Sequence, residues 1–584
     1  MIRICPAHNE TTEKGSRPGR AVCPIDGVAS PGAVIAVAGI VVSAIIGAAL
    51  YSAPVRGAEQ PPKRPALPYT VSKETTFFTE PLRADGSVDY ADAINQRISK
   101  GVTPENNASV LIWRAAAPKE IPERLRARYF ARMGVEPPSE QGNYLCDLYD
   151  YLENNGQPPI TERQRELAAE QMDVALSRPW SRDEFPLIAQ WLAANEKPLA
   201  LIVEASKRPR RFDPLIYDGG DDDLLVAMLL PAVSIYRNAT RLLCVRAMLK
   251  AKENDVAGAW DDVMSCYRLS RLIGQGPTLV ESLVAIAIDS TSFAATGALL
   301  ENTQIGGEVL ARMRQDMAAL TPQRRLAEII DQSERLLYLG YVALMAKQGL
   351  SKFDVIFRLS SGGQSQPSFI DALVEMVGKT AIDWDHILRK GNQWYDRIVA
   401  ALNKPSLVQR RVAMIQLRDE LRDLDKSAVD LTGILLERLL RPRQAVSDRV
   451  ADILIVLLFP SIETCVLAED RWVVQHEVLA TGLAAAAYAH EHGRLPEDLE
   501  QLVPKYLPRV PDDILSDPPG VSIRFKKTDG GCIIYSVGRN GRDDQGRNSC
   551  DAAKAAKAEG STEGEQPDWD DIVVRLRLPT NERR

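Results

Sequence analysis

The chain has 584 residues, enough for roughly three or four domains or for one large helical body with smaller attachments. Its hydrophobic content of 45% and charged content of 26% are ordinary for a folded protein. The formal net charge of −7 is spread along the sequence and gives no electrostatic support for nucleic-acid binding, so we exclude that class of function.

An uncharged segment rich in Ala, Val and Ile occupies residues 32–51. A helix of about 20 apolar residues can cross the core of a bilayer. We expect a single retained inner-membrane anchor, with residues 1–31 as a cytoplasmic tail and the bulk of the chain on the periplasmic side. A cleaved signal peptide is the alternative, but the apolar run is longer than a usual signal core. Residues 52–68 are rich in proline and predict an extended linker.

Helical spacing dominates from residue 69 to residue 460, which we interpret as a helical domain of unknown function. The pattern predicts a helix at 89–99. Thr161 and Gln164 form a capping-box pattern, and Thr321-Pro322 suggests an N-cap followed by a proline in the first helical turn. These signals mark three helix starts.

Two further helices are predicted between Asp255 and Leu300, joined by a Gly/Pro-containing turn at 274–277. Each carries an apolar row: Trp260, Val263, Met264 and Tyr267 in the first, and Leu279, Leu283, Ile286 and Ala287 in the second. The pair is similar to a tetratricopeptide hairpin. No second copy occurs at a fixed period, so an irregular helical domain is favoured over a repeat solenoid.

Residues 461–579 are typical of a small α+β module. A helix at 476–492 ends at Gly493, where a left-handed cap favours a residue without Cβ. Alternating apolar residues then predict three strands, at 521–525, 533–537 and 572–576, with a hairpin turn at Asp529–Gly531. The expected fold class is therefore mainly α, with a membrane-anchored helical body followed by a helix and a three-stranded antiparallel sheet.

Five short sequence motifs follow one another along this module: His492–Pro496, Asp517–Gly520, Tyr535–Gly541, Asp543-Asp544 and Asp570–Val573. In this order they resemble the globular part of type II secretion pseudopilins and the pilin-like envelope proteins of planctomycete-type bacteria. The helical region is likewise similar to uncharacterised planctomycete envelope proteins. Two departures are Pro519, at a position where the family has an aromatic residue, and an extra polar run at 547–567. The prepilin cleavage motif is absent from the sequence.

The resemblance implies a calcium site, because the equivalent loop and a late aspartate hold calcium in major pseudopilins. By position the ligands here are Asp543, Asp544 and Asp571, helped by carbonyl oxygens near Ser536. The alternative is an ordinary acidic loop without an ion, tied by a Cys532–Cys550 disulfide if the module is exported. The remaining cysteines of the helical region are expected to be buried core residues: Cys146, Cys244, Cys266 and Cys465.

Recognised catalytic motifs are missing from the sequence. His476 begins a pattern like that of zinc-protease helices, but Ala480 stands where the second metal ligand is required. His490 and His492 are expected to complement the negative C-terminal end of their helix. The basic run Lys207–Arg211 is interpreted as a solvated loop. No catalytic residue is assigned.

The function that these observations favour is structural. We expect a non-enzymatic envelope protein that docks protein partners, in a secretion-like or pilus-like assembly. An exported hydrolase with residues scattered over the helical region is the first alternative, and a helical-repeat scaffold that binds peptides is the second. A deep pocket lined by carboxylates with perturbed pKa values favours the hydrolase, whereas a shallow surface with an apolar patch favours docking.

Overall fold

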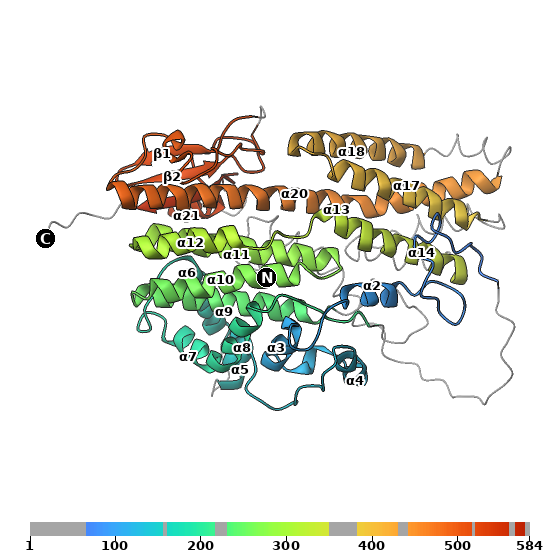
Figure 1. Ribbon diagram of the computed structural model, residues 1–584, viewed down its shortest axis with the longest axis horizontal. Coiled ribbons are helices and arrows are strands. Elements are labelled where there is room, and N and C mark those ends of the chain that lie inside the picture. Colours follow the sequence, from blue (N-terminus) through green and yellow to red (C-terminus); the bar gives the residue numbers. More distant parts are fainter. Residues whose placement is uncertain are drawn as a thin grey trace, which may run out of the picture.

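The computed structural model describes residues 66–155, 161–216, 230–349, 382–429, 442–516, 520–559 and 567–577. In these residues the chain is mainly helical, with a small antiparallel sheet near its C-terminus (Figure 1). The predicted fold class is confirmed at this level. The expected anchor at 32–51 and most of the expected linker lie outside the described residues.

Short helices open the described part of the chain: α2 (Tyr90–Ile98), α3 (Ala108–Ala115), η2 (Pro118–Glu120), α4 (Glu123–Arg132), α5 (Leu148–Asn155), α6 (Glu162–Ser177), α7 (Pro186–Ala194) and α8 (Glu196–Ser206). Longer helices follow: α9 (Ala232–Lys252), α10 (Val256–Ile273), α11 (Leu279–Asn302) and α12 (Gly307–Ala319). The next elements are α13 (Leu326–Ile329), η4 (Ile330–Glu334), α14 (Arg335–Gln348), α17 (Trp384–Leu402), α18 (Leu407–Val429) and α20 (Pro442–His492). The C-terminal part contains η6 (Leu499–Leu502), β1 (Arg524–Thr528), β2 (Gly531–Ser536), α21 (Ser549–Glu559) and β3 (Ile572–Arg577).

Two of the three predicted helix starts are correct. Asp89 caps α2, and Thr161 caps α6 through a complete capping box with Gln164. The start predicted at Thr321-Pro322 is wrong, because the next helix, α13, begins at Leu326. Glu469 of α20 accepts a hydrogen bond from the Leu326 N–H at 2.9 Å, so a side chain distant in sequence supplies the cap.

Helix α11 lies between two hydrophobic clusters. Leu283 on one side belongs to a cluster with α2, α13, α14, α17, α18 and the first part of α20. Val284 and Ile288 on the other side belong to a cluster with α3–α10, α12, the last part of α20 and the sheet. The predicted α10–α11 hairpin is confirmed, and it forms the centre of the molecule.

The sheet has the strand order β1-β2-β3, and both pairs are antiparallel. The turn predicted at Asp529–Gly531 is confirmed, since Thr528 pairs with Gly531. The first strand begins at Arg524 rather than at Val521, because Ser522 instead makes an isolated bridge with Asp512. The helix predicted at 476–492 is the last third of the 51-residue α20.

Figure 1 shows α20 running along the whole long axis, with the sheet over one end and α17 and α18 over the other. Strand β3 packs against both α11 and α20. Helix α20 and strand β3 are in close contact at Gly482, where an added Cβ would lie 2.7 Å from a methyl carbon of Val574. The C-terminal module therefore shares its hydrophobic core with the helical body.

Candidate functional site

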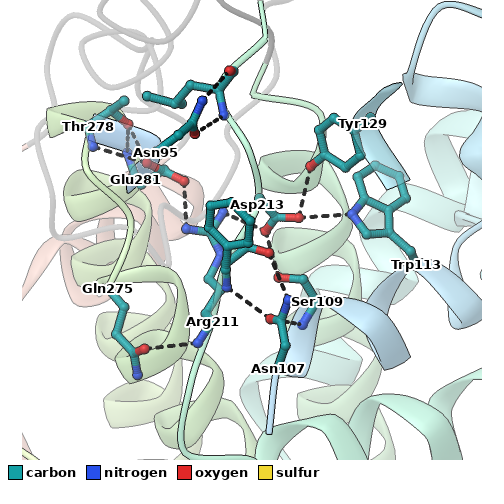
Figure 2. A network of polar contacts seen from close by, with 12 residues as sticks. Asn95, Asn107, Ser109, Trp113, Tyr129, Arg211, Asp213, Gln275, Thr278 and Glu281 are labelled. Carbon is teal, nitrogen blue, oxygen red and sulfur yellow. Dashed lines mark hydrogen bonds and ion pairs between the residues drawn. The ribbon is translucent and has the colours of Figure 1, made fainter. Parts of the chain in front are cut away.

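An extensive buried polar cluster surrounds Arg211 (Figure 2). This residue closes the basic run that the sequence analysis interpreted as a solvated loop. The interpretation holds for Lys207 and Arg210, which are exposed, but it is wrong for Arg211, which is 6% exposed. Two carboxylates from different parts of the fold compensate the positive charge of this buried guanidinium.

Arg211 bridges Asp213 and Glu281. One terminal guanidinium nitrogen lies 2.9 Å from Oδ2 of Asp213, and the other lies 2.6 Å from Oε1 of Glu281. All three side chains are at most 8% exposed. The Arg211 backbone N–H also donates to Oε1 of Gln275, in the turn that joins α10 to α11, at 3.0 Å. The segment after α8 is thereby fixed to the start of α11.

Both carboxylate oxygens of Asp213 accept hydrogen bonds from side chains of the N-terminal helices. Its Oδ1 accepts hydrogen bonds from Nε1 of Trp113 and from Oη of Tyr129, both at 2.9 Å. Its Oδ2 accepts one from Oγ of Ser109 at 2.8 Å in addition to the ion pair with Arg211. These donors come from α3 and α4, roughly a hundred residues earlier in the chain. Asp213 therefore holds the N-terminal helices against the α10–α11 hairpin.

Glu281 has a second role at the start of α11. Its Oε2 accepts hydrogen bonds from the Thr278 N–H at 3.1 Å and from the Thr278 hydroxyl at 2.8 Å, completing a capping box. Its Oε1 remains for Arg211. The same carboxylate thus stabilises a helix N-terminus and a buried cation.

The charges in this cluster are fixed rather than reactive. Burial disfavours the charged guanidinium, but the carboxylates of Glu281 and Asp213 outweigh that effect and hold the pKa of Arg211 above its usual value. Burial and the adjacent Asp213 raise the pKa of Tyr129 well above its usual value. The hollow beside the cluster, lined also by Leu230 and Val233, has room for about one water molecule. This geometry fits a structural role for the cluster.

A second buried ionic cluster connects the body to α20. Asp289 of α11 is 1% exposed and accepts from Nε2 of His476 at 2.9 Å, while its other oxygen pairs with Arg271 of α10. The His476 ring also lies 5.0 Å from the ring of Trp472. His476 therefore stabilises the interface between α11 and α20.

The same arrangement recurs elsewhere in the described residues. Arg335 is buried and bridges Asp331 at 2.6 Å and Asp396 at 2.7 Å. Arg410 is buried and bridges Glu469 and Asp470 of α20. Each pair or triad joins different helices or successive turns at an interface. Buried charges of this kind are tolerated because they are ion-paired, although Nε of Arg211, Arg335 and Arg410 has no hydrogen-bond partner within the described residues. Removal of one member of a pair is therefore expected to be costly.

Of the three predicted calcium ligands, Asp543 and Asp544 lie in the loop after β2 and Asp571 lies directly before β3, and the structure gives all three other partners. Both oxygens of Asp571 accept backbone N–H groups, from Gly546 at 2.8 Å and from Asp544 at 3.4 Å. Oδ2 of Asp544 accepts hydrogen bonds from Asn540 and from the Asp570 N–H. The carboxylates thus face N–H donors rather than a common centre.

Asp543 differs in that it faces a cation of the protein. Its Oδ2 lies 3.3 Å from Nε of Arg524, and its Oδ1 accepts from the Tyr535 hydroxyl at 3.1 Å. No group of three His, Cys, Asp or Glu side chains in the described ranges is arranged to hold an ion. The calcium site therefore stays a prediction, and binding would require these carboxylates to turn away from their present donors.

Asp571 is nevertheless electrostatically unusual. Burial, together with the nearby carboxylates of Asp544 and Asp543, raises the pKa of Asp571 to about 7, although the N–H groups of Gly546 and Asp544 act in the opposite direction. The folded state therefore binds a proton more tightly than the unfolded chain, whose aspartates titrate near pH 4.

We expect this raised pKa to make stability depend on pH. Between about pH 4 and pH 7 the folded state keeps a proton that the unfolded state has lost, so the free energy of unfolding should fall as the pH rises through this window. Asp571→Asn should remove the part of that fall that Asp571 contributes, leaving the part due to Glu334, whose pKa is also raised to about 7. Asp529→Asn in the exposed hairpin turn should leave the whole fall unchanged. Urea unfolding at several pH values measures the effect. An Asp571→Asn protein with the wild-type pH dependence would contradict the assignment.

The predicted calcium site is tested by thermal melting. If calcium binds there, the folded chain should melt higher in millimolar calcium than in chelator at pH 7.5, because a ligand of the folded state stabilises it by mass action. Magnesium should have less effect, since it demands a tighter octahedral shell. Asp571→Asn should abolish any difference. Identical melting curves with calcium and with chelator would leave the loop as a metal-free connection.

The predicted histidine and cysteine roles have mixed outcomes. His490 and His492 lie in the last turn of α20, as expected. Cys244, Cys266 and Cys465 are buried as predicted, whereas Cys146 is only half-buried. No disulfide joins Cys532 to Cys550 in the part of the chain that the structure describes, so their pairing remains a prediction.

Glu334 is a further titratable group that the sequence did not indicate. It lies at the end of η4, a π-helical turn of the kind often found at functional sites. Burial raises the pKa of Glu334 to about 7. The hollow beside Arg211 is lined by other residues, so Glu334 is not part of it.

Comparisons with protein-family models, with curated proteins and with solved structures found no match to this chain. The pseudopilin-like and planctomycete-type resemblance therefore remains a prediction. Among the described helices, α11 alone is long and apolar enough to cross a membrane, but 72% of its most apolar stretch is buried inside the protein, which is typical of a core helix.

Proposed function

We propose that this chain is a non-enzymatic, membrane-anchored envelope protein that docks a protein partner. The observation that carries the proposal is an exposed apolar row on α18. Val408, Val412 and Ile415 are 43%, 50% and 40% exposed, and their spacing of four and three residues places them on one face of the helix. Single exposed apolar residues are ordinary, whereas a contiguous row marks a binding surface.

The opposite face of α18 already has its partners. Met414, Leu417 and Leu421 are buried in the cluster around α17 and α20, and Arg410 anchors the helix through Glu469 and Asp470. The outer row is therefore not needed to hold α18 in place. A helix that is fixed on one side and apolar on the other is suited to receiving a second helix.

The charges beside the row indicate the chemistry of that partner. Arg411 lies next to Val412 on the exposed side, and Lys404 is exposed just before α18. The exposed Asp419, one turn after Ile415, is already paired with Arg418 and Arg422. We therefore propose an amphipathic helix of another envelope protein, with apolar residues along its centre and acidic residues along its edge. The buried carboxylates of the Arg211 and Asp289 clusters are paired, which favours this docking role over the hydrolase.

Glu334 is the observation that favours an enzyme. A half-buried carboxyl with a pKa near 7 is suited to accept or donate a proton at neutral pH. The second candidate function is therefore a hydrolase that uses Glu334 as its acid or base. Loss of a measured hydrolytic activity in Glu334→Gln, with an unchanged melting temperature, would support this alternative.

The docking proposal is tested by site-specific photocrosslinking in native membranes. A photoreactive residue at Val412 of the full chain should give a crosslink to one protein, mapped to an acidic amphipathic helix. The matched control is the same residue at Leu167, which is 46% exposed on α6. Val408→Ser with Ile415→Ser should abolish the crosslink from position 412 without lowering the melting temperature. Crosslinks only to lipid, to a second copy of the chain, or equally from position 167 would overturn the proposal.

The predicted topology has its own test. The C-terminal module should be degraded by protease added to spheroplasts, because we place the bulk of the chain on the periplasmic side. Degradation only after the inner membrane has been lysed would contradict this placement.

A further inference from the structure

Two buried thiols meet between α9 and α10. Sγ of Cys244 and Sγ of Cys266 are 3.9 Å apart, although the residues are 22 positions apart in the chain. Both residues are at most 1% exposed. The two helices lie side by side at the centre of the first hydrophobic cluster (Figure 1).

We propose that Cys244 and Cys266 are joined by a disulfide bond when the chain folds in the presence of a disulfide oxidant. The sulfur atoms need to approach from 3.9 Å to about 2.05 Å, which rotation about the Cα–Cβ bonds and small shifts of the two helices can provide. The inference does not depend on the docking role, since it concerns the body and not α18.

The reaction is a thiol–disulfide exchange. The two S–H bonds are lost, an Sγ–Sγ bond forms, and the two electrons and two protons pass to one small disulfide, which becomes two thiols. The attacking species is a thiolate. The oxidant is therefore a small-molecule or protein disulfide, such as those that maintain oxidising extracytoplasmic compartments.

Burial determines when this exchange occurs. Desolvation, together with the adjacent Cys244 thiol, raises the pKa of Cys266 well above its usual value, so thiolate is scarce in the folded protein. The hydrophobic cluster also excludes the oxidant. The bond consequently forms while α9 and α10 are still assembling, and the folded, reduced protein reacts slowly.

The test uses the full chain, unfolded in reductant and refolded either with a mixture of oxidised and reduced glutathione or with reductant alone. After alkylation of free thiols, trypsin releases Leu242–Arg246 and Glu253–Arg268, each of which contains one of the two cysteines. The oxidised sample should yield these two peptides as one linked species. It should also melt a few degrees higher than the reduced sample, because the bond restricts the unfolded chain.

Cys244→Ala should remove both the linked species and the difference in melting temperature. Cys465→Ala, which changes another buried cysteine, should leave both unchanged. Alkylated Cys244 and Cys266 in the oxidised, refolded protein would overturn the proposal. Linkage of either residue to a different cysteine would overturn it equally, and the peptide masses distinguish these outcomes even if a variant folds poorly.

Discussion

Arg211→Met should lower the free energy of unfolding by roughly 3–5 kcal/mol, which is the range for removing one partner of a buried ion pair. The substitution keeps most of the side-chain volume but leaves Asp213 and Glu281 buried without their shared cation. Urea unfolding followed by circular dichroism measures the change. Arg210→Met is the matched control, because Arg210 is exposed and donates only to a backbone carbonyl at 3.0 Å.

A triple variant distinguishes the effect of the lost charge from the effect of the altered packing. Arg211→Met combined with Asp213→Asn and Glu281→Gln removes the cation and both carboxylates together. We expect it to recover part of the lost stability, since neutral amides are less costly to bury than unpaired carboxylates. A single variant as stable as the Arg210→Met control would show that the Arg211 cluster does not hold the N-terminal helices in place.

Asp289→Asn should have a comparable effect, again roughly 3 kcal/mol or more, because it leaves Arg271 and His476 facing a neutral amide. The wild-type contribution should depend on pH. Burial alone would raise the pKa of Asp289, but His476 and Arg271 outweigh it and hold that pKa below its usual range. The stabilisation is therefore complete above the unfolded pKa near 4, begins to decrease as the pH falls below it, and is lost fully only as the pH falls through the lower pKa of the folded state.

The matched control is Asp261→Asn on the neighbouring helix α10. Asp261 also pairs with an arginine, Arg312, but its side chain is 55% exposed, and exposed pairs contribute at most about 1 kcal/mol. Unfolding curves at pH 7 and at pH 3.5 compare both variants with the wild-type protein. An Asp289→Asn protein that differs from wild type by the same amount at both pH values would contradict the electrostatic account.

Local sequence signals predicted much of the helical architecture. A helix start depends on a few adjacent residues, which is why the capping box at Thr161 and the helix beginning beside Asp89 were predicted correctly. The start of α13 was missed because its cap, Glu469, lies 143 residues away. The first strand was placed three residues too early, since alternation of apolar residues does not distinguish a ladder from the isolated bridge at Ser522.

The Arg211 cluster was missed for the same physical reason. Its partners Ser109, Trp113 and Glu281 come from helices that only the tertiary fold brings together. One local signal was present. Arg211 and Asp213 alternate in an extended segment with the apolar Phe212 between them, before Leu215 and Ile216, and charged residues so placed tend to be paired inside.

The length of α20 has a mechanical consequence. At 51 residues it extends for roughly 76 Å at 1.5 Å per residue. Residues of α20 belong to both hydrophobic clusters, so the helix is packed in the core of the body at both ends. The sheet at one end cannot swing as a hinged domain, because its helix continues unbroken into the body. A pulling force applied to β3 would be transmitted along α20 to α17 and α18. In a single-molecule pulling experiment the module and the body should therefore give way together, in one extension step.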